Sequence, residues 1–436
     1  VTGVVKDAAG EPIPGANVFW MNTTNGVTTN EDGNFSIHKP ARSHMLVVSF
    51  IGFENDTIHV DKGNQQLDIV LREGVELSEV NVVTRKLGTM KLRTSVMNED
   101  MISSAELTRA ACCNLGESFV TNPSVDVSYS DAATGAKQIK LLGLSGTYVQ
   151  MMTENIPNFR GAAAPYGLGY VPGPWMQSIQ VSKGSSSVKN GYESITGQIN
   201  VEFKKPQLPE ADWVSANLFA SSTNRYEANA DATVKLSKRW STSLLAHYEN
   251  ETKSHDSNDD GFVDIPRVEQ YNVWNRWAYM GDHYVFQAGI KALHETRNSG
   301  QIAHGNTPSH DLYEIGIKTN RYEAFTKNAY IFDKEKNTNL ALILQGTLHN
   351  QDANYGRKLY DVDQSNFYAS LLFETELSKQ HSLSAGLSFN YDGYDQNYRL
   401  TNQAEEGLTK KFVKESVPGA YVPVSYTHLR AHETGR

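Results

Sequence analysis

The sequence predicts a mainly β protein: a small N-terminal β-sandwich, then an α+β domain, then the first part of a transmembrane antiparallel β-barrel. Residues 1–72 contain short apolar strands separated by dense turn signals such as Pro14-Gly15 and Asp32-Gly33. From Asp212 onward the strands are longer and alternate apolar with polar residues. At 436 residues the chain is long enough for several domains.

Composition narrows the class of protein. The chain has 40 Lys and Arg against 49 Asp and Glu, and this net charge of −9 argues against nucleic acid as a partner. Its 21 Tyr and 6 Trp suit a membrane interface or a polar β surface. The sequence holds no apolar run of about 18 residues, the length of a membrane-spanning helix, but spanning strands need only ~9–11 alternating residues.

Residues 1–73 form the predicted sandwich, with strands within Thr28–Ile37, Leu46–Phe53 and Leu67–Leu71. Its histidines lack the spacing of metal ligands. A linker at 74–89 follows, and within it Leu77–Thr84 is β-branched and has no core of its own. Such a segment is suited to adding a strand to the sheet edge of a partner, although an ordinary linker strand is the alternative.

Residues 90–206 form the predicted α+β domain. A helix is expected to begin at Ser103-Ser104 and to continue through Leu115–Thr121. The segment Asn155–Trp175 is rich in Gly, Pro and aromatic residues, and a loop of this length inside a compact domain is usually functional. Cys112 and Cys113 are adjacent, so they predict no disulfide framework, and small half-buried side chains are favoured over a metal or redox pair.

Residues 207–422 predict barrel strands, roughly ten of them between Asp212 and Tyr421. In His381–Asp392, Leu387 and its apolar neighbours share one face while Ser388 and other polar residues share the opposite face. We expect the apolar face to contact lipid. Residues 423–436 lose the alternation and resemble translated sequencing-adapter sequence, so we expect a non-native tail and a chain that is a fragment at both ends.

One acidic loop has the oxygen spacing of a calcium site. Positions 1, 3, 5, 7 and 9 of the loop are Asp256, Asn258, Asp260, the carbonyl of Phe262, and Asp264. Gly261 occupies the turn position, but Arg267 stands where the bidentate Glu belongs. The sequence therefore predicts weak Ca²⁺ binding, with a merely acidic solvated turn as the alternative. No organic cofactor is expected.

No catalytic constellation accompanies this loop. We find no Ser/His/Asp or Cys/His pattern and no phosphate-binding Walker-type loop, so the sequence predicts that the chain is not an enzyme.

The segment Ile179–Val201, IQVSKGSSSVKNGYESITGQINV, closely resembles the end of the plug domain in TonB-dependent outer-membrane receptors. In that family a VxKG…SxxxGxxxxxGxINV pattern directly precedes the barrel. Residues 1–73 resemble the carboxypeptidase-regulatory-like domain that lies ahead of the plug in Bacteroidetes receptors. One departure is Leu142-Gly143, where receptors of this family usually carry Arg-Gly.

The resemblance implies residue roles. The TonB contact would be Leu77, Ser78, Glu79, Val80, Asn81, Val82 and Val83. The ligand-binding plug loop would face outward and use Asn158, Phe159, Arg160, Tyr166, Tyr170 and Trp175. Further implied partners are ExbB and ExbD with TonB, outer-membrane lipid, and a surface lipoprotein.

The resemblance also implies a function. It places the chain in the outer membrane with its N-terminal domain in the periplasm, importing a siderophore, cobalamin or other metal chelate. A SusC-like glycan or peptide importer is the alternative within the family. A non-transporting exported β-rich binding protein or adhesin is the alternative outside it.

Overall fold

The computed structural model describes residues 1–426 apart from 8–9, 22–24, 31, 41–43, 51–55, 61–64, 72–88, 92–98, 110–112, 121, 123, 145, 185–187, 192, 207–212, 303–311, 379–380 and 402–408. Among the described residues no helix is both long and apolar enough to cross a membrane. The chain divides into two compact units, Val1–Arg85 with Asp333–Thr338, and Lys86–Phe332 with Asn339–Arg436.

The first unit is a small β-sandwich, as predicted. One sheet has the order β4 (Asn34–Ser36), β1 (Thr2–Lys6), β7 (Gln66–Val70). The other has the order β3 (Gly26–Thr28), β2 (Asn17–Trp20), β5 (Met45–Ser49), β6 (Asp56–His59). Both sheets contribute to one apolar core, in which Val5, Trp20 and Leu46 are fully buried. Buried residues alternate with more exposed ones along β1 and β2, and this is why every second residue of each strand is apolar in the sequence.

The second unit contains an inner domain, Thr89–Pro206. Its main sheet has the order β13 (Ile156–Pro157), β12 (Val149–Thr153), β15 (Gly197–Phe203), β14 (Met176–Lys183), β9 (Glu99–Ser103), β8 (Thr89–Lys91). A separate hairpin pairs β10 (Val125–Asp131) with β11 (Ala136–Leu141). The helix α1 (Ser104–Arg109) begins where predicted.

The predicted continuation of that helix over Leu115–Thr121 is wrong. The described residues of that stretch, 115–120, contain a single 3₁₀ turn, η1 (Leu115–Glu117). The side chain of Asn114 accepts a hydrogen bond from the Glu117 amide at 3.3 Å, and Asn at this position starts a new turn.

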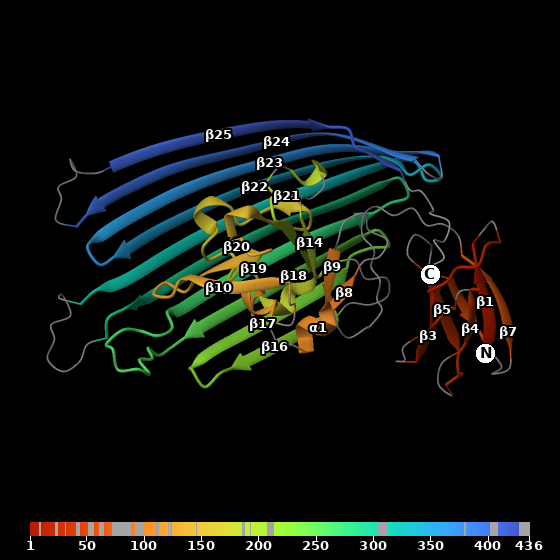
Figure 1. Cartoon of the computed structure of the whole chain (residues 1–436), viewed down its shortest axis with the longest axis horizontal. Helices are drawn as coiled ribbons and strands as arrows, with labels where there is room; N and C mark the ends of the chain where they lie inside the picture. The colour runs from red at the N-terminus through yellow and green to blue at the C-terminus, as the bar shows by residue number, and fades with distance from the viewer. Residues whose placement is uncertain are drawn as a thin grey trace, which may run out of the picture. The chain divides into compact units, whose positions relative to one another are not determined.

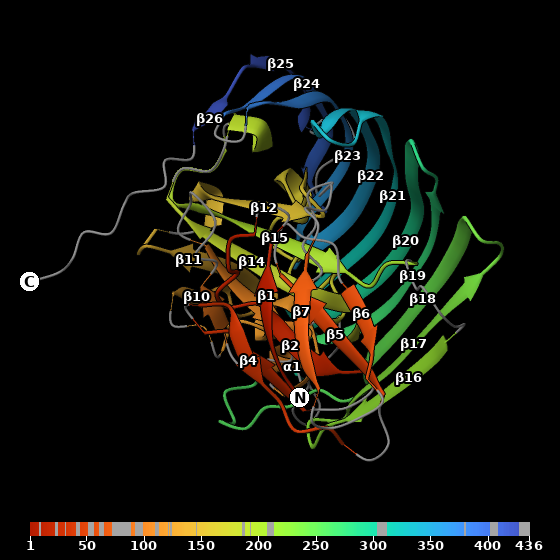
Figure 2. The same ribbon diagram turned by 90° about the vertical axis from the view of Figure 1, so that its right-hand side faces the viewer.

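The wall is a sheet in which strands that follow one another in the chain also lie side by side (Figure 1). Its ten main strands are β16 (Trp213–Ala220), β17 (Arg225–Lys235), β18 (Trp240–Glu251), β19 (Arg267–Met280), β20 (Tyr284–Gly300), β21 (Glu314–Asp333), β22 (Thr338–Tyr355), β23 (Lys358–Ser378), β24 (His381–Leu400) and β25 (Thr409–Tyr421). A short β26 (Val424–Tyr426) pairs with β24. Figure 2 shows the wall curving around the inner domain. The predicted strand number is confirmed.

The wall is polar inside and apolar outside. Inward side chains such as Asn272, Arg276 and Asp392 are almost completely buried. Outward side chains such as Leu218 (82% exposed) and Leu387 (58% exposed) remain open. A soluble β-sandwich has the reverse arrangement, whereas a lipid-facing sheet requires this one. The predicted apolar-out, polar-in pattern is therefore confirmed.

Aromatic side chains border the apolar outer band on both sides. Tyr248 and Tyr271 lie opposite each other with ring centroids 4.9 Å apart, and Trp240 and Tyr279 do the same at 5.1 Å. On both strands the two rows are eight residue steps apart, which is about 27 Å along a strand and roughly 20 Å for a strand tilted by about 40°. This height suits the hydrocarbon layer of a thin outer membrane.

Ile290 tests this band, because it pairs with Asn275, midway between Tyr271 and Tyr279, and is 70% exposed. Ile290→Arg should destabilise the full-length protein by about 2–4 kcal/mol in a bilayer folding titration. Thr296→Arg is the matched control, because Thr296 pairs with Glu269 beyond the Tyr271 row and should cost about 0–1 kcal/mol. Equal costs at the two positions would contradict a lipid-facing band.

Candidate functional site

The contact between the inner domain and the wall is a candidate site because charged groups meet there at short distances. Among the described residues six ion pairs cross it: Glu117–Arg225 at 3.1 Å, Glu154–Arg276 at 2.6 Å, Glu154–Lys327 at 3.6 Å, Arg160–Asp392 at 3.2 Å, Lys189–Glu374 at 2.5 Å and Lys204–Asp231 at 3.0 Å. Both partners supply both signs of charge. The inward polar face of the wall is therefore complementary to the inner domain, group by group.

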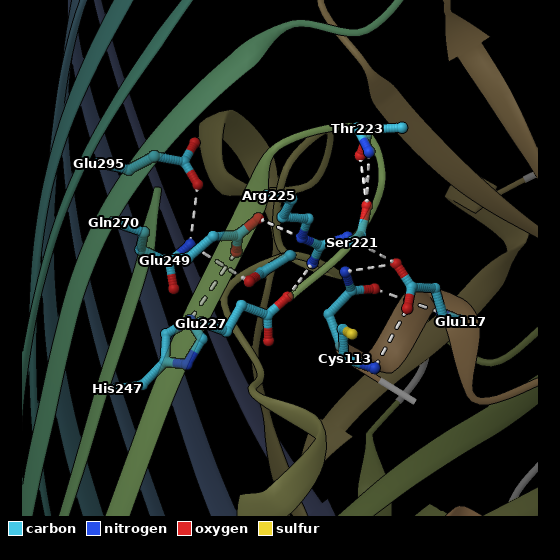
Figure 3. A network of polar contacts seen from close by, with 12 residues as sticks. Cys113, Glu117, Ser221, Thr223, Arg225, Glu227, His247, Glu249, Gln270 and Glu295 are labelled. Atoms are coloured by element: carbon cyan, nitrogen blue, oxygen red, sulfur yellow. Dashed lines mark hydrogen bonds and ion pairs between the residues drawn. The ribbon is translucent and has the colours of Figure 1, made fainter. Parts of the chain in front are cut away.

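Arg225 is the centre of one network, shown in Figure 3. Its guanidinium contacts three carboxylates: Glu227 at 2.7 Å, Glu249 at 2.9 Å and Glu117 at 3.1 Å. Glu227 and Glu249 come from neighbouring wall strands, whereas Glu117 belongs to the inner domain. The planar guanidinium has five N–H donors in a fixed fork, so one Arg can hold several carboxylates at once.

The network extends to the inner domain through Glu117. The amide of Cys113 donates to Glu117 Oε2 at 3.1 Å, and the Asn114 side chain donates to Oε1 at 3.1 Å. Burial, together with the nearby Glu227 carboxylate, raises the pKa of the Cys113 thiol far above its usual range. The thiol is therefore protonated, in keeping with the predicted structural reading of this cysteine; Cys112 lies outside the described residues.

A cleft of about 190 Å³ adjoins this network. Arg225, Glu249 and Glu251 line it from the wall, and Glu117, Lys137 and Tyr166 line it from the inner domain. Arg297, which also lines the cleft, lies over the Tyr166 ring at 4.9 Å and is paired with Glu295 at 3.0 Å. The cleft therefore offers hydrogen-bond donors and acceptors of both charges to a polar solute or to water.

The predicted ligand loop lies against the wall rather than free in solvent. Tyr170 and Trp175 are fully buried. The carbonyl of Tyr170 accepts a hydrogen bond from Asn272 at 3.0 Å, and the Trp175 ring packs 6.3 Å from Trp274. In this conformation these two side chains position the loop, and neither is accessible to a ligand.

The other four predicted loop residues line one of two hollows between the loop and its surroundings. Tyr166 is 6% exposed and lines the cleft beside Arg225. Asn158 accepts from Arg321 at 2.6 Å and donates to Glu323 at 2.9 Å. Together with Phe159 and Arg160 it lines a cavity of about 570 Å³. Ligand contact by this loop stays a prediction.

The acidic loop does not present a calcium ligand set in this structure. Its carboxylates accept backbone amides of the loop itself: Asp256 from Gly261 at 2.8 Å, Asp260 from Phe262 at 2.8 Å, and Asp264 from Ser257 at 2.7 Å. Within the described part of the chain, no three His, Cys, Asp or Glu side chains converge as a metal site would require. This geometry favours the acidic turn, and calcium binding stays a prediction.

The predicted partner segment, Leu77 to Val83, lies within 72–88 and so outside the described residues. The sequence reading missed the wall residues Arg225, Arg276, Arg321 and Glu323. The signal that could have found them is a charged residue at an inward position of an alternating strand, because lipid-facing strands place only their polar face inside.

Two family models match the chain. Residues 1–83 match the CarboxypepD_reg-like domain, and residues 91–198 match the TonB-dependent Receptor Plug Domain. The chain is 27% identical over 242 residues to the TonB-dependent receptor SusC of Bacteroides thetaiotaomicron, covering 52% of this chain and 23% of that protein. It is 36% identical over 84 residues to the TonB-dependent receptor P39 of Formosa agariphila, covering 19% of this chain and 8% of that protein. The chain thus spans less than a quarter of these relatives.

Solved structures share the fold. FpvA of Pseudomonas aeruginosa, in complex with a heterologous pyoverdine and iron, superposes with a TM-score of 0.65 at 12% identity, covering 83% of this chain and 55% of FpvA. The alcaligin outer-membrane receptor FauA of Bordetella pertussis gives 0.62 at 14% identity, covering 81% and 58%. At such identities the likeness establishes the architecture of inner domain and surrounding wall, and nothing about the ligand.

The Arg225 network predicts a large effect of removing its central guanidinium. Arg225→Met takes away the cation that contacts Glu117, Glu227 and Glu249 together, so the full-length protein should lose about 3–5 kcal/mol of stability in a folding titration. The matched control is Arg239→Met, because Arg239 pairs with Asp282 where both side chains are more than half exposed, and its loss should have no measurable effect. A small loss of stability in Arg225→Met would mean that water solvates the three carboxylates when the guanidinium is absent.

The burial of Cys113 predicts that its thiol reacts slowly in the folded protein. In a Cys112→Ser background, alkylation of Cys113 by iodoacetamide at pH 8 should be at least about tenfold slower in the folded protein than in the urea-unfolded protein, because only the thiolate reacts. Equal rates would show that the thiol is accessible and that its pKa is not raised by the fold.

Proposed function

Because this chain belongs to the TonB-dependent receptors of the Bacteroidetes type, we propose that it imports a scarce solute across the outer membrane. The observation that carries the proposal is an inner domain of plug type held inside a lipid-facing wall by charged contacts. A polar interface of this kind can be rehydrated when it opens, so it suits a plug that must move. Receptors of this family are transporters rather than enzymes.

The proposed energy source is the inner-membrane complex of TonB with ExbB and ExbD. The contact would be Leu77 to Val83, which lies between the sandwich and the inner domain and is suited to strand addition. This partner requires the N-terminal sandwich to be periplasmic. The connections between wall strands support that orientation. Residues 236–239 and 281–283 are short links on one side, and 252–266 is a long link on the other, as in outer-membrane barrels.

The proposed substrate class is a siderophore, cobalamin or other metal chelate. FpvA and FauA, which share the fold, are receptors for pyoverdine and alcaligin. The relative SusC supports a second candidate within the same family, a glycan or peptide importer, because its sequence similarity extends over half of this chain. Uptake assays with a panel of ferric siderophores, cobalamin and oligosaccharides separate the two candidates.

Energy-dependent uptake tests the function itself. Cells carrying the full-length receptor should accumulate the cognate solute only when TonB is present, and a protonophore should stop accumulation without removing surface binding. Binding without any accumulation would instead indicate the alternative, an exported binding protein or adhesin.

The proposed TonB contact makes a sharper prediction. Val80→Pro removes a backbone donor and prevents strand addition, so uptake should fall to the level seen without TonB while the ligand affinity of the receptor is unchanged. Val80→Ala keeps the donor and is the control. Uptake by Val80→Pro at the wild-type rate would place the contact elsewhere.

A further inference from the structure

A strained turn of the inner domain lies at the most deeply buried of its ion pairs with the wall. Glu154 and Asn155 connect β12 to β13, and both have left-handed backbone angles, with φ of 51° and 62°. A two-residue hairpin turn of type I′ between paired strands requires positive φ at both central residues. Asn tolerates this region, so the backbone strain of the turn lies at Glu154.

The turn is held from within the inner domain by two hydrogen bonds. The amide of Glu154 donates to the carbonyl of Val201 at 2.9 Å, and the amide of Asn155 donates to Asn200 Oδ1 at 2.8 Å. Both acceptors lie on β15. These bonds fix the backbone of the turn but leave the Glu154 carboxylate directed at the wall.

Two wall cations hold the same turn from outside. Arg276 on β19 donates from Nη2 to Glu154 Oε1 at 2.6 Å and from Nη1 to the Lys204 carbonyl at 2.7 Å. Lys327 on β21 donates to the Glu154 carbonyl at 2.7 Å and lies 3.6 Å from its Oε2. We call Arg276 and Lys327 the clamp. It binds side chain and backbone of one turn, and Arg276 also binds the segment that leads into the wall.

The contact between Arg276 and Glu154 is shielded from water. The side chains of Arg276 and Glu154 are 2% and 3% exposed, and the guanidinium lies 4.5 Å from the centre of the Trp274 ring. By contrast, the Lys189–Glu374 pair, which also joins the inner domain to the wall, is 32% and 26% exposed. Loss of Arg276 would leave the buried Glu154 carboxylate with only the longer contact to Lys327 at 3.6 Å. Water can replace either partner of the Lys189–Glu374 pair, so losing the two contacts should have different effects.

From this geometry we propose that Arg276 is a positioning residue of transport, which keeps the inner domain closed by holding the Glu154–Asn155 turn. The inference rests on the proposed function. It adds that release of this one turn from the clamp is a required step in opening a path along the wall. Within the inner domain the turn is held by the pairing of β12 with β13 and by the two β15 bonds, so the wall contacts are the ones that release must break.

The experiment measures leakage through the full-length receptor in cells without TonB, using vancomycin, which intact outer membranes exclude. Arg276→Met should raise vancomycin sensitivity at least about tenfold, since loss of a buried partner shifts the closed–open equilibrium by at least that factor. Arg276→Lys should restore part of the closure. Lys189→Met, the matched control, should leave sensitivity at the wild-type level.

Two further measurements separate a positioning role from a folding defect. Heat-modifiable electrophoretic mobility reports whether the wall is assembled, and equilibrium binding of the cognate solute should be unchanged in every variant that assembles. If Arg276→Met does not assemble, Glu154→Gln decides, because it removes the charge and keeps the turn residue nearly isosteric. It should leak as Arg276→Met is expected to.

Wild-type exclusion by both Arg276→Met and Glu154→Gln, or equal leakage by Lys189→Met, would overturn the clamp. Leakage needs no TonB, so it tests the clamp alone. Failure of the wild-type receptor to accumulate solute in a TonB-dependent way would instead overturn the proposed function.

Discussion

The structure depends on one constraint: a sheet whose outer face is apolar must satisfy every charged group on its inner face. Outward residues such as Leu218 and Ile290 remain exposed, while inward residues such as Arg276 and Arg321 are almost completely buried. A buried charge without a partner is very costly, so an unoccupied interior could only be filled by water. The inner domain replaces that water with carboxylates, amides and carbonyls at hydrogen-bonding distance.

This constraint also determines how firmly the inner domain is held. Ion pairs in a dehydrated contact contribute little net stability relative to water, but removing one partner alone is strongly destabilising. An interface of paired charges can therefore be stable while closed and still open without exposing a large apolar surface. An apolar interface of the same size would resist opening by ~25 cal/mol for each Å² exposed.

The wall could be predicted from the sequence because its pattern is local. Alternation along β24 places Leu387 outside and Asp392 inside, and the structure agrees. The N-terminal sandwich follows from the same kind of local signal, as does the start of α1 at Ser104. The extension of that helix to Thr121 was wrong because Asn114, read as part of a helix, caps a separate turn.

The site could not be predicted to the same degree, because its contacts join residues far apart in the chain. Glu154 and Arg276 are 122 residues apart, and no periodic pattern indicates which inward charge meets which turn. The assignment of Tyr170 and Trp175 to ligand contact rests on the length and composition of the loop and on the resemblance to the plug family. The wall strands that cover them are encoded a hundred residues later, so their burial was not visible in the loop sequence.

The most direct test of this account uses two tryptophans of one strand. Trp274 faces inward and packs at 4.7 Å against Phe203 of the inner domain, whereas Trp277 faces outward and is 41% exposed. Variants of the full-length protein that keep one of these and replace the other tryptophans by Phe can be reconstituted in bilayers of lipids brominated on their acyl chains. The account predicts strong quenching of Trp277 fluorescence and little quenching of Trp274. Equal quenching of the two would contradict a wall with lipid on one face and the inner domain on the other.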